Sequence, residues 1–143
     1  MKILSIDTSS NVCGVAILEN TNLICKLDTN TGRTHSENLM PMIDEALKKS
    51  ESKPSDINLI VCDIGPGSFT GIRIGVATAK AFSDSLSIPC VGVSSLETLA
   101  FGMMFFGTEQ KCIRQTFENK VEIFQNEIKY VCSIVDCKND NCY

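Results

Sequence analysis

The fold of this chain is decided by the stretch Gly65-Pro66-Gly67-Ser68-Phe69-Thr70-Gly71-Ile72-Arg73-Ile74-Gly75. An apolar run at 59–64 precedes it, and such a run is typical of a strand buried on both faces. A helical pattern follows at 69–86. A strand, a glycine-rich turn and a helix in this order predict an α/β unit. The turn is not a Walker A loop, and it does not match G-x-G-x-x-G.

Two interpretations of the glycine-rich turn stay open. Glycines permit left-handed backbone, and the unpaired amides at a helix start hold anions. On this interpretation a phosphate faces the glycine turn and the polar turn after the first strand, at Gly65, Gly67, Ser68, Asp7, Thr8 and Ser9. On the other, the turn joins a strand to a helix and binds nothing.

Small residues recur at every fourth position of the same helix, at Gly71, Gly75 and Ala79. They leave one helix face nearly flat, and a flat face lets another backbone approach closely. The approaching backbone belongs either to a partner chain or to the protein's own sheet. Both alternatives remain open from the sequence.

Three short apolar segments at 2–6, 13–18 and 23–28 open the chain. Short polar turns join them, so they predict an antiparallel meander. A helix follows at 36–49, with Ser36 as its cap and Pro41 tolerated in its first turn.

A further buried strand is expected at 89–93, and a helix follows it to about residue 104. The order predicts a mixed sheet with helices packed on it. We expect 1–104 to form one subdomain and 105–130 to be a partly helical connection. Residues 131–143 would then begin a second subdomain.

Composition excludes several classes of function. The 143 residues carry a net charge of −4, which predicts weak stand-alone binding to tRNA because phosphate contacts supply most non-specific affinity. The chain has no apolar run long enough to cross a membrane and no signal peptide, so we expect a cytoplasmic protein.

The single histidine of the chain, His35, completes neither a metal set nor a catalytic triad. The eight cysteines are expected to be reduced and structural.

Several of these segments together resemble the TsaB family, also called YeaZ, within the wider glycoprotease-like family. They are Ile3-Leu-Ser-Ile-Asp-Thr-Ser-Ser10, Arg33-x-His35-Ser36-Glu37-x-Leu39-x-Pro41, Gly65 to Lys80, Gly92 to Glu97, and Val135-Asp136-x-Lys138-Asn139-Asp140. The resemblance implies an actin-like (ASKHA), ribonuclease-H-like fold. It also implies a non-catalytic scaffold in tRNA threonylcarbamoyladenosine modification, which binds the transferase paralogue TsaD and the ATPase TsaE and touches tRNA only indirectly.

The resemblance also bears on catalysis. TsaD-like sequences carry a His-x-x-x-His metal motif, and the aligned positions here are Ser95 and Leu99. We therefore expect no catalytic residue, no metal and no cofactor. An actin-like ATP-dependent phosphotransferase and a glycoprotease-like peptidase remain the alternatives.

The interface implied by this scaffold role uses the helices at 36–49 and 69–86. They would pair with TsaD, or with a second copy in its absence. The residues expected at this interface are His35, Ser36, Leu39, Met40, Ile43, Leu47, Phe69, Gly71, Ile72, Gly75 and Ala79.

Overall fold

A computed structural model describes residues 1–30, 34–106, 112–115 and 121–124. The elements are β1 (Lys2–Asp7), β2 (Cys13–Glu19), β3 (Asn22–Thr29), α1 (His35–Lys49), η1 (Pro54–Asp56), β4 (Ile57–Asp63), α2 (Phe69–Leu86), β5 (Cys90–Val93), α3 (Ser95–Phe106), β6 (Cys112–Gln115) and β7 (Val121–Phe124). None of the helices in these ranges is long and apolar enough to cross a membrane.

A five-stranded mixed sheet forms the centre of the molecule, in the order β3-β2-β1-β4-β5. The strands β1, β2 and β3 pair antiparallel, which confirms the predicted meander. Strand β4 lies parallel to β1, and β5 lies parallel to β4. The α/β fold class predicted from the sequence is therefore the observed one.

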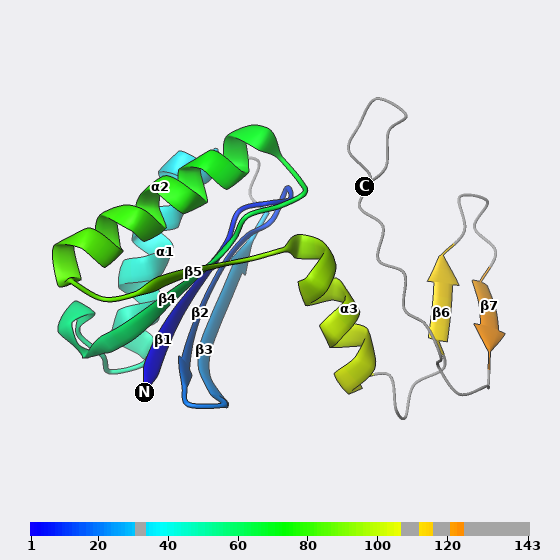
Figure 1. Cartoon of the computed structure of the whole chain (residues 1–143), viewed down its shortest axis with the longest axis horizontal. Coiled ribbons are helices and arrows are strands. Elements are labelled where there is room, and N and C mark those ends of the chain that lie inside the picture. The colour runs from blue at the N-terminus through cyan, green and yellow to red at the C-terminus, as the bar shows by residue number, and fades with distance from the viewer. Residues whose placement is uncertain (31–33, 107–111, 116–120, 125–143) are drawn as a thin grey trace.

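Helices α1 and α2 cover one face of the sheet, and α3 lies on the other side (Figure 1). Alternate strand residues point under the two helices and form the core. The largest fully buried side chains are Leu4, Ile6, Ile17, Leu39, Ile43 and Ile60. The core thus lies between the sheet and the α1–α2 layer, because period-2 strands and period-3.6 helices present their apolar sides to each other.

The start of α1 differs from the prediction. Its cap is Thr34 rather than Ser36, and the Glu37 carboxylate accepts a hydrogen bond from the Thr34 amide at 3.1 Å. Because the helix begins at His35, Pro41 lies in its second turn and not in its first. Proline has no amide hydrogen, so the Glu37 carbonyl loses its partner four residues on. Both residues are exposed, and water can satisfy that carbonyl.

The connection at 105–130 was expected to be partly helical. Its described residues also include two short strands. The helix α3 ends at Phe106, and β6 and β7 then pair as an antiparallel two-stranded sheet. Ile113 pairs with Ile123, and β-branched residues favour strands. Ile113, Val121 and Phe124, whose spacing favoured a helix, lie in these two strands, and the rest of the predicted connection stays a prediction. The second subdomain predicted at 131–143 lies outside the described residues.

Candidate functional site

The glycine-rich turn is hydrogen-bonded to, and packs closely against, the turn that follows β1. The Ser68 amide donates to the Ser9 carbonyl at 2.6 Å, and the Ser68 hydroxyl accepts from the Gly71 amide at 3.2 Å. A side chain at Gly67 would overlap the Ser9 carbonyl oxygen. Gly65 has a φ of +93°, a conformation that favours glycine.

The predicted phosphate-facing residues therefore do come together, and several of their polar groups already hydrogen-bond within the protein. The buried Thr8 hydroxyl donates to the Gly71 carbonyl at 2.8 Å. The Asp7 carboxylate accepts from the Ser9 amide at 2.9 Å and from its hydroxyl at 2.7 Å. This geometry fits a turn that holds the start of α2 against the turn after β1, and the phosphate-facing role stays a prediction.

His35 adds further contacts between the start of α1, the start of α2 and the turn that follows β1. Its Nε2 donates to the Ser10 carbonyl at 2.8 Å, and its ring lies beside Gly71. Among the described residues its buried Nδ1 has no hydrogen-bond partner. His35 was predicted at a partner interface, and in the structure it holds α1, α2 and the β1–β2 turn together.

The small-residue stripe of α2 faces inward. Gly71, Gly75 and Ala79 are all buried, and a side chain at Gly75 would overlap the Thr8 hydroxyl and lie 3.4 Å from the Cys62 sulfur. The stripe thus packs on the protein's own sheet. The prediction that it meets a partner chain is wrong, because the flat face lets α2 approach β1 and β4.

The remaining predicted interface residues divide by burial. Leu39, Ile43 and Leu47 belong to the core, so their helical spacing marked the inner side of α1. Ile72 is half-buried. Met40 and Phe69 are 52% and 73% exposed, and Ser36 is also exposed. Of the predicted interface set, these three lie on the outer surface of the helix layer.

An apolar groove of about 520 Å³ runs between α1 and α2. It is lined by Met40, Ala77, Thr78, Ala81, Phe82, Ser85 and Leu86. Except for Met40, these residues were missed from the sequence. The available signal was the second small-residue repeat, Ala77 and Ala81, on a different side of α2 from the glycines.

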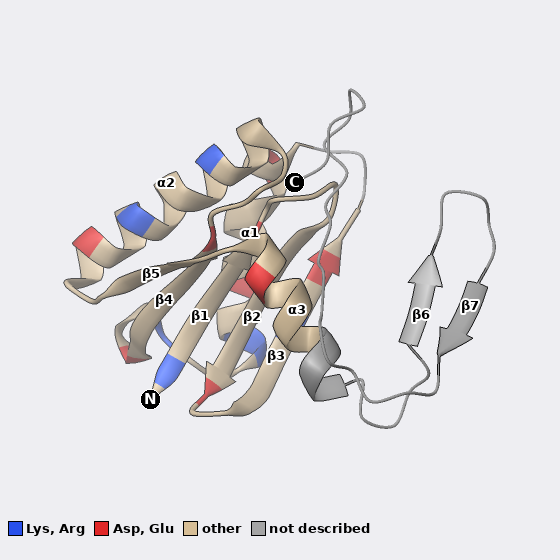
Figure 2. Cartoon of the chain, turned by 45° about the vertical axis from the view of Figure 1, so that its right-hand side comes forward, with Lys and Arg blue, Asp and Glu red and all other residues tan. Residues whose placement is uncertain are grey.

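Exposed charged residues lie on both helices outside the residues that line the groove. Figure 2 colours the charged positions along α2. On α1, Lys48 pairs with Asp44 at 2.6 Å and Lys49 pairs with Glu45 at 2.7 Å. On α2, the Arg73 guanidinium lies 4.8 Å from the centroid of the exposed Phe69 ring. That contact is a cation–π interaction at the amino-terminal end of the helix.

A buried hydrogen-bond network fixes the start of α3. The Asp63 carboxylate, at the end of β4, accepts from the Gly65 amide and from the Ser95 hydroxyl, both at 2.6 Å. The Ser95 amide in turn donates to the Gly65 carbonyl at 2.9 Å. Ser95 is therefore occupied as a donor, while Leu99, one turn later, is 49% exposed.

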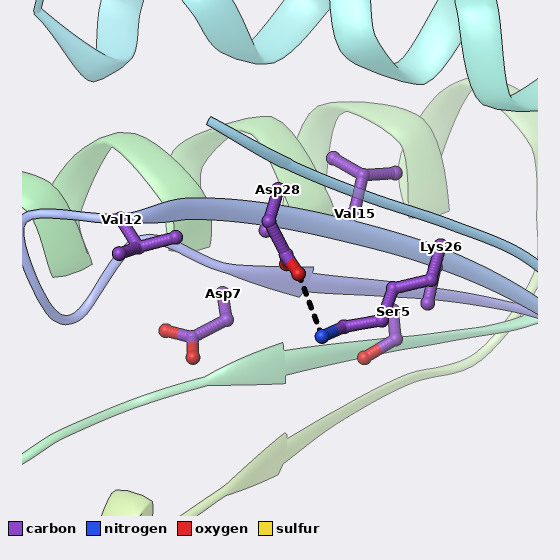
Figure 3. A pocket seen from close by; sticks show the side chains of 8 residues that line it. Ser5, Asp7, Val12, Val15, Lys26 and Asp28 are labelled. Atoms are coloured by element: carbon purple, nitrogen blue, oxygen red, sulfur yellow. Dashed lines mark ion pairs between the residues drawn. The ribbon is translucent and has the colours of Figure 1, made fainter. Parts of the chain in front are cut away.

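A smaller hollow of about 220 Å³ lies on the sheet face away from α1 and α2. Ser5, Asp7, Lys26 and Asp28 contribute its polar groups, and Lys26 pairs with Asp28 at 2.6 Å (Figure 3). Within the described ranges, no three His, Cys, Asp or Glu side chains gather closely enough to hold a metal ion.

Cys13, Cys25 and Cys62 are buried free thiols, and Cys90 is an exposed one. Burial, with smaller contributions from Cys90 and the carboxylates of Asp63 and Asp7, raises the pKa of the Cys62 thiol to about 12. Burial and then Asp7 raise the pKa of Cys13 as well. Cys13 and Cys62 therefore stay protonated and act as small apolar groups of the core.

Comparison with known proteins matches this chain to one family. The sequence model described as TsaD, tRNA N6-adenosine threonylcarbamoyltransferase, matches residues 28–113. The tRNA threonylcarbamoyladenosine biosynthesis protein TsaB of Bacillus subtilis is 45% identical over 100 residues, which are 70% of this chain and 44% of the relative. TsaB of Escherichia coli is 36% identical over 102 residues, 71% of this chain and 44% of the relative. The chain thus spans less than half the length of these two relatives.

The fold has a counterpart among solved structures. A Pseudomonas aeruginosa protein, described as uncharacterized with similarity to the peptidase YeaZ, superposes with a TM-score of 0.68 at 24% identity. The superposition covers 87% of this chain and 64% of that one. A second structure, YeaZ from the same organism, gives a TM-score of 0.67 at 23% identity. The family model covers more than half of the chain, so this chain belongs to the glycoprotease-like family and is similar to its TsaB (YeaZ) members.

Proposed function

We propose that this chain takes part in tRNA threonylcarbamoyladenosine biosynthesis as a non-catalytic partner protein. It binds a TsaD-type paralogue through the outer surface of α1 and α2, and the ATPase TsaE joins that assembly. In the absence of the paralogue, the same surface pairs two copies of the chain. The names of the relatives support the role in tRNA modification, and the groove between α1 and α2 supports the docking surface.

The observation that carries the proposal is the apolar groove between α1 and α2. It brings exposed Met40 together with Phe82 and Leu86 on the surface of the helix layer. Apolar grooves of this kind accept the apolar side of a partner helix. The burial of the glycine stripe supports a docking surface on the opposite, outward side of α2.

The network at Ser95 supports the non-catalytic part of the proposal. Where the family resemblance places the first histidine of the paralogue's metal motif, this chain has a hydroxyl that donates to Asp63 at 2.6 Å. Where it places the second, the chain has Leu99. Neither side chain is an imidazole that ligates a metal.

The test is binding of the TsaD-type paralogue from the same cell to single-residue variants of this chain. Met40→Asp introduces a carboxylate into the groove, and we expect the dissociation constant to rise about tenfold or more because a charge is then buried against apolar groups. Threonylcarbamoyladenosine formation in a reconstituted system should fall in parallel.

A matched control is available on the sheet. Leu23 on β3 is 58% exposed, close to the 52% of Met40, and lies outside the groove. Leu23→Asp should leave both binding and tRNA modification unchanged. Equal behaviour of the two variants, or no binding of the paralogue to the unaltered chain, would refute the proposed docking surface.

A further inference from the structure

The sheet face away from α1 and α2 carries two neighbouring rows of residues that cross β1, β2 and β3. Each row has one residue from each strand, and the rows lie two residues apart along the strands. Residues two apart in a strand share a face, so both rows open into the same hollow. The first row is Asp7, Gly14 and Asp28, and the second row is Ser5, Ala16 and Lys26.

The middle strand supplies the floor of this hollow of about 220 Å³. Gly14 has no side chain and Ala16 has only a methyl group, so the longer side chains of β1 and β3 form the walls (Figure 3). A Cβ atom at Gly14 would lie 3.3 Å from Oδ1 of Asp28. The Asp28 carboxylate therefore leans over the floor, and the hollow exists because the two floor residues are small.

Several polar groups of the hollow have no partner over the described residues. Asp7 uses Oδ1 for both of its hydrogen bonds with Ser9, which leaves Oδ2 unused. Asp28 uses Oδ2 for its ion pair with Lys26, which leaves Oδ1 unused. The half-buried Ser5 has no hydrogen bond through its hydroxyl. The Lys26 ammonium has one partner there and carries three N–H donors.

The two rows offer opposite halves of one kind of ligand. The first row presents carboxylate oxygens, which accept hydrogen bonds from an ammonium group. The second row presents an ammonium and a hydroxyl, which donate to a carboxylate. Two carboxylates and one ammonium leave a net negative charge in the hollow, so a phosphate would be repelled. An amine without an acid group would leave the donors of the second row unused.

We propose that this hollow binds a small α-amino acid in its zwitterionic form. The ammonium group of the ligand lies between Asp7 and Asp28, and its carboxylate lies against Ser5 and Lys26. A volume of about 220 Å³ admits a small side chain as well. The site goes beyond the proposed function, because it lies on the opposite face of the sheet from the docking surface.

Isothermal titration calorimetry with L-alanine and two analogues tests the zwitterion. Ethylamine lacks the carboxylate of L-alanine, and propionate lacks its ammonium group. We expect the unaltered chain to bind one L-alanine, with a dissociation constant about tenfold or more below that of either analogue, because each analogue leaves one row unpaired. Absence of L-alanine binding, equal binding of ethylamine or propionate, or tighter binding of inorganic phosphate would each overturn the inference.

Variants of the full chain locate the site. Ala16→Val fills the floor without changing the charge, and Lys26→Met removes the partner of the ligand carboxylate. Each should raise the dissociation constant for L-alanine about tenfold or more while the circular dichroism spectrum stays unchanged.

The control is Glu19→Gln, which removes an exposed carboxylate at the end of β2, outside the hollow. It should bind L-alanine as the unaltered chain does. Folded Ala16 and Lys26 variants with unchanged affinity, or an equal loss in the Glu19 variant, would place the binding elsewhere and refute the site. Paralogue binding is measured separately on the other face, so failure here leaves the proposed function standing.

Discussion

At the scale of the residue, Gly71 shows how one missing methyl group sets the distance between a helix and a sheet. A side chain there would overlap the Thr8 carbonyl oxygen, which belongs to the backbone and cannot rotate away. Gly71→Ala should therefore lower the free energy of unfolding by about 1–3 kcal/mol, the usual cost of overpacking. Gly102→Ala is the control, because a side chain at Gly102 meets no atom of the described residues within 4 Å. That change should be neutral or stabilise α3 by up to about 1 kcal/mol, since alanine favours helices. Urea denaturation measures both, and equal midpoints would refute the steric argument.

At the scale of the element, the sequence predicted which segments form strands and helices better than it predicted which way they face. The meander and the α/β units followed from apolar period and turn residues, which are local signals. The direction of the Gly71-Gly75-Ala79 stripe depends on β1, which lies more than sixty residues earlier in the chain. Spacing alone favours neither an inward nor an outward stripe.

The attachment of α3 to the sheet can be tested at the same scale. Ser95→Ala removes the 2.6 Å hydrogen bond to the buried Asp63 carboxylate. We expect a loss of about 1–3 kcal/mol in the free energy of unfolding, because a buried acceptor loses a donor. Ser85→Ala is the control, since its exposed hydroxyl donates to the Ala81 carbonyl within α2. Thermal denaturation of the two variants compares them directly, and a Ser95 variant as stable as the Ser85 variant would contradict the assigned role.

At the scale of the whole molecule, charge decides how the chain meets RNA. The 13 basic residues are outnumbered by 17 acidic ones, and Lys26, Lys48 and Lys49 are each paired with a carboxylate. Figure 2 shows both signs interspersed over the described elements rather than gathered in a basic stripe.

We therefore expect the isolated chain to bind tRNA no more tightly than the non-specific range, a dissociation constant of about 10⁻⁴ M or weaker at physiological salt. Fluorescence anisotropy with labelled tRNA measures this, with the paralogue alone and the mixture as comparisons. The chain should change tRNA binding only when the paralogue is present and Met40 is intact, because its influence passes through the contact between the two proteins. A dissociation constant well below about 10⁻⁶ M for the isolated chain, tighter than the non-specific range, would mean that the chain itself recognises tRNA.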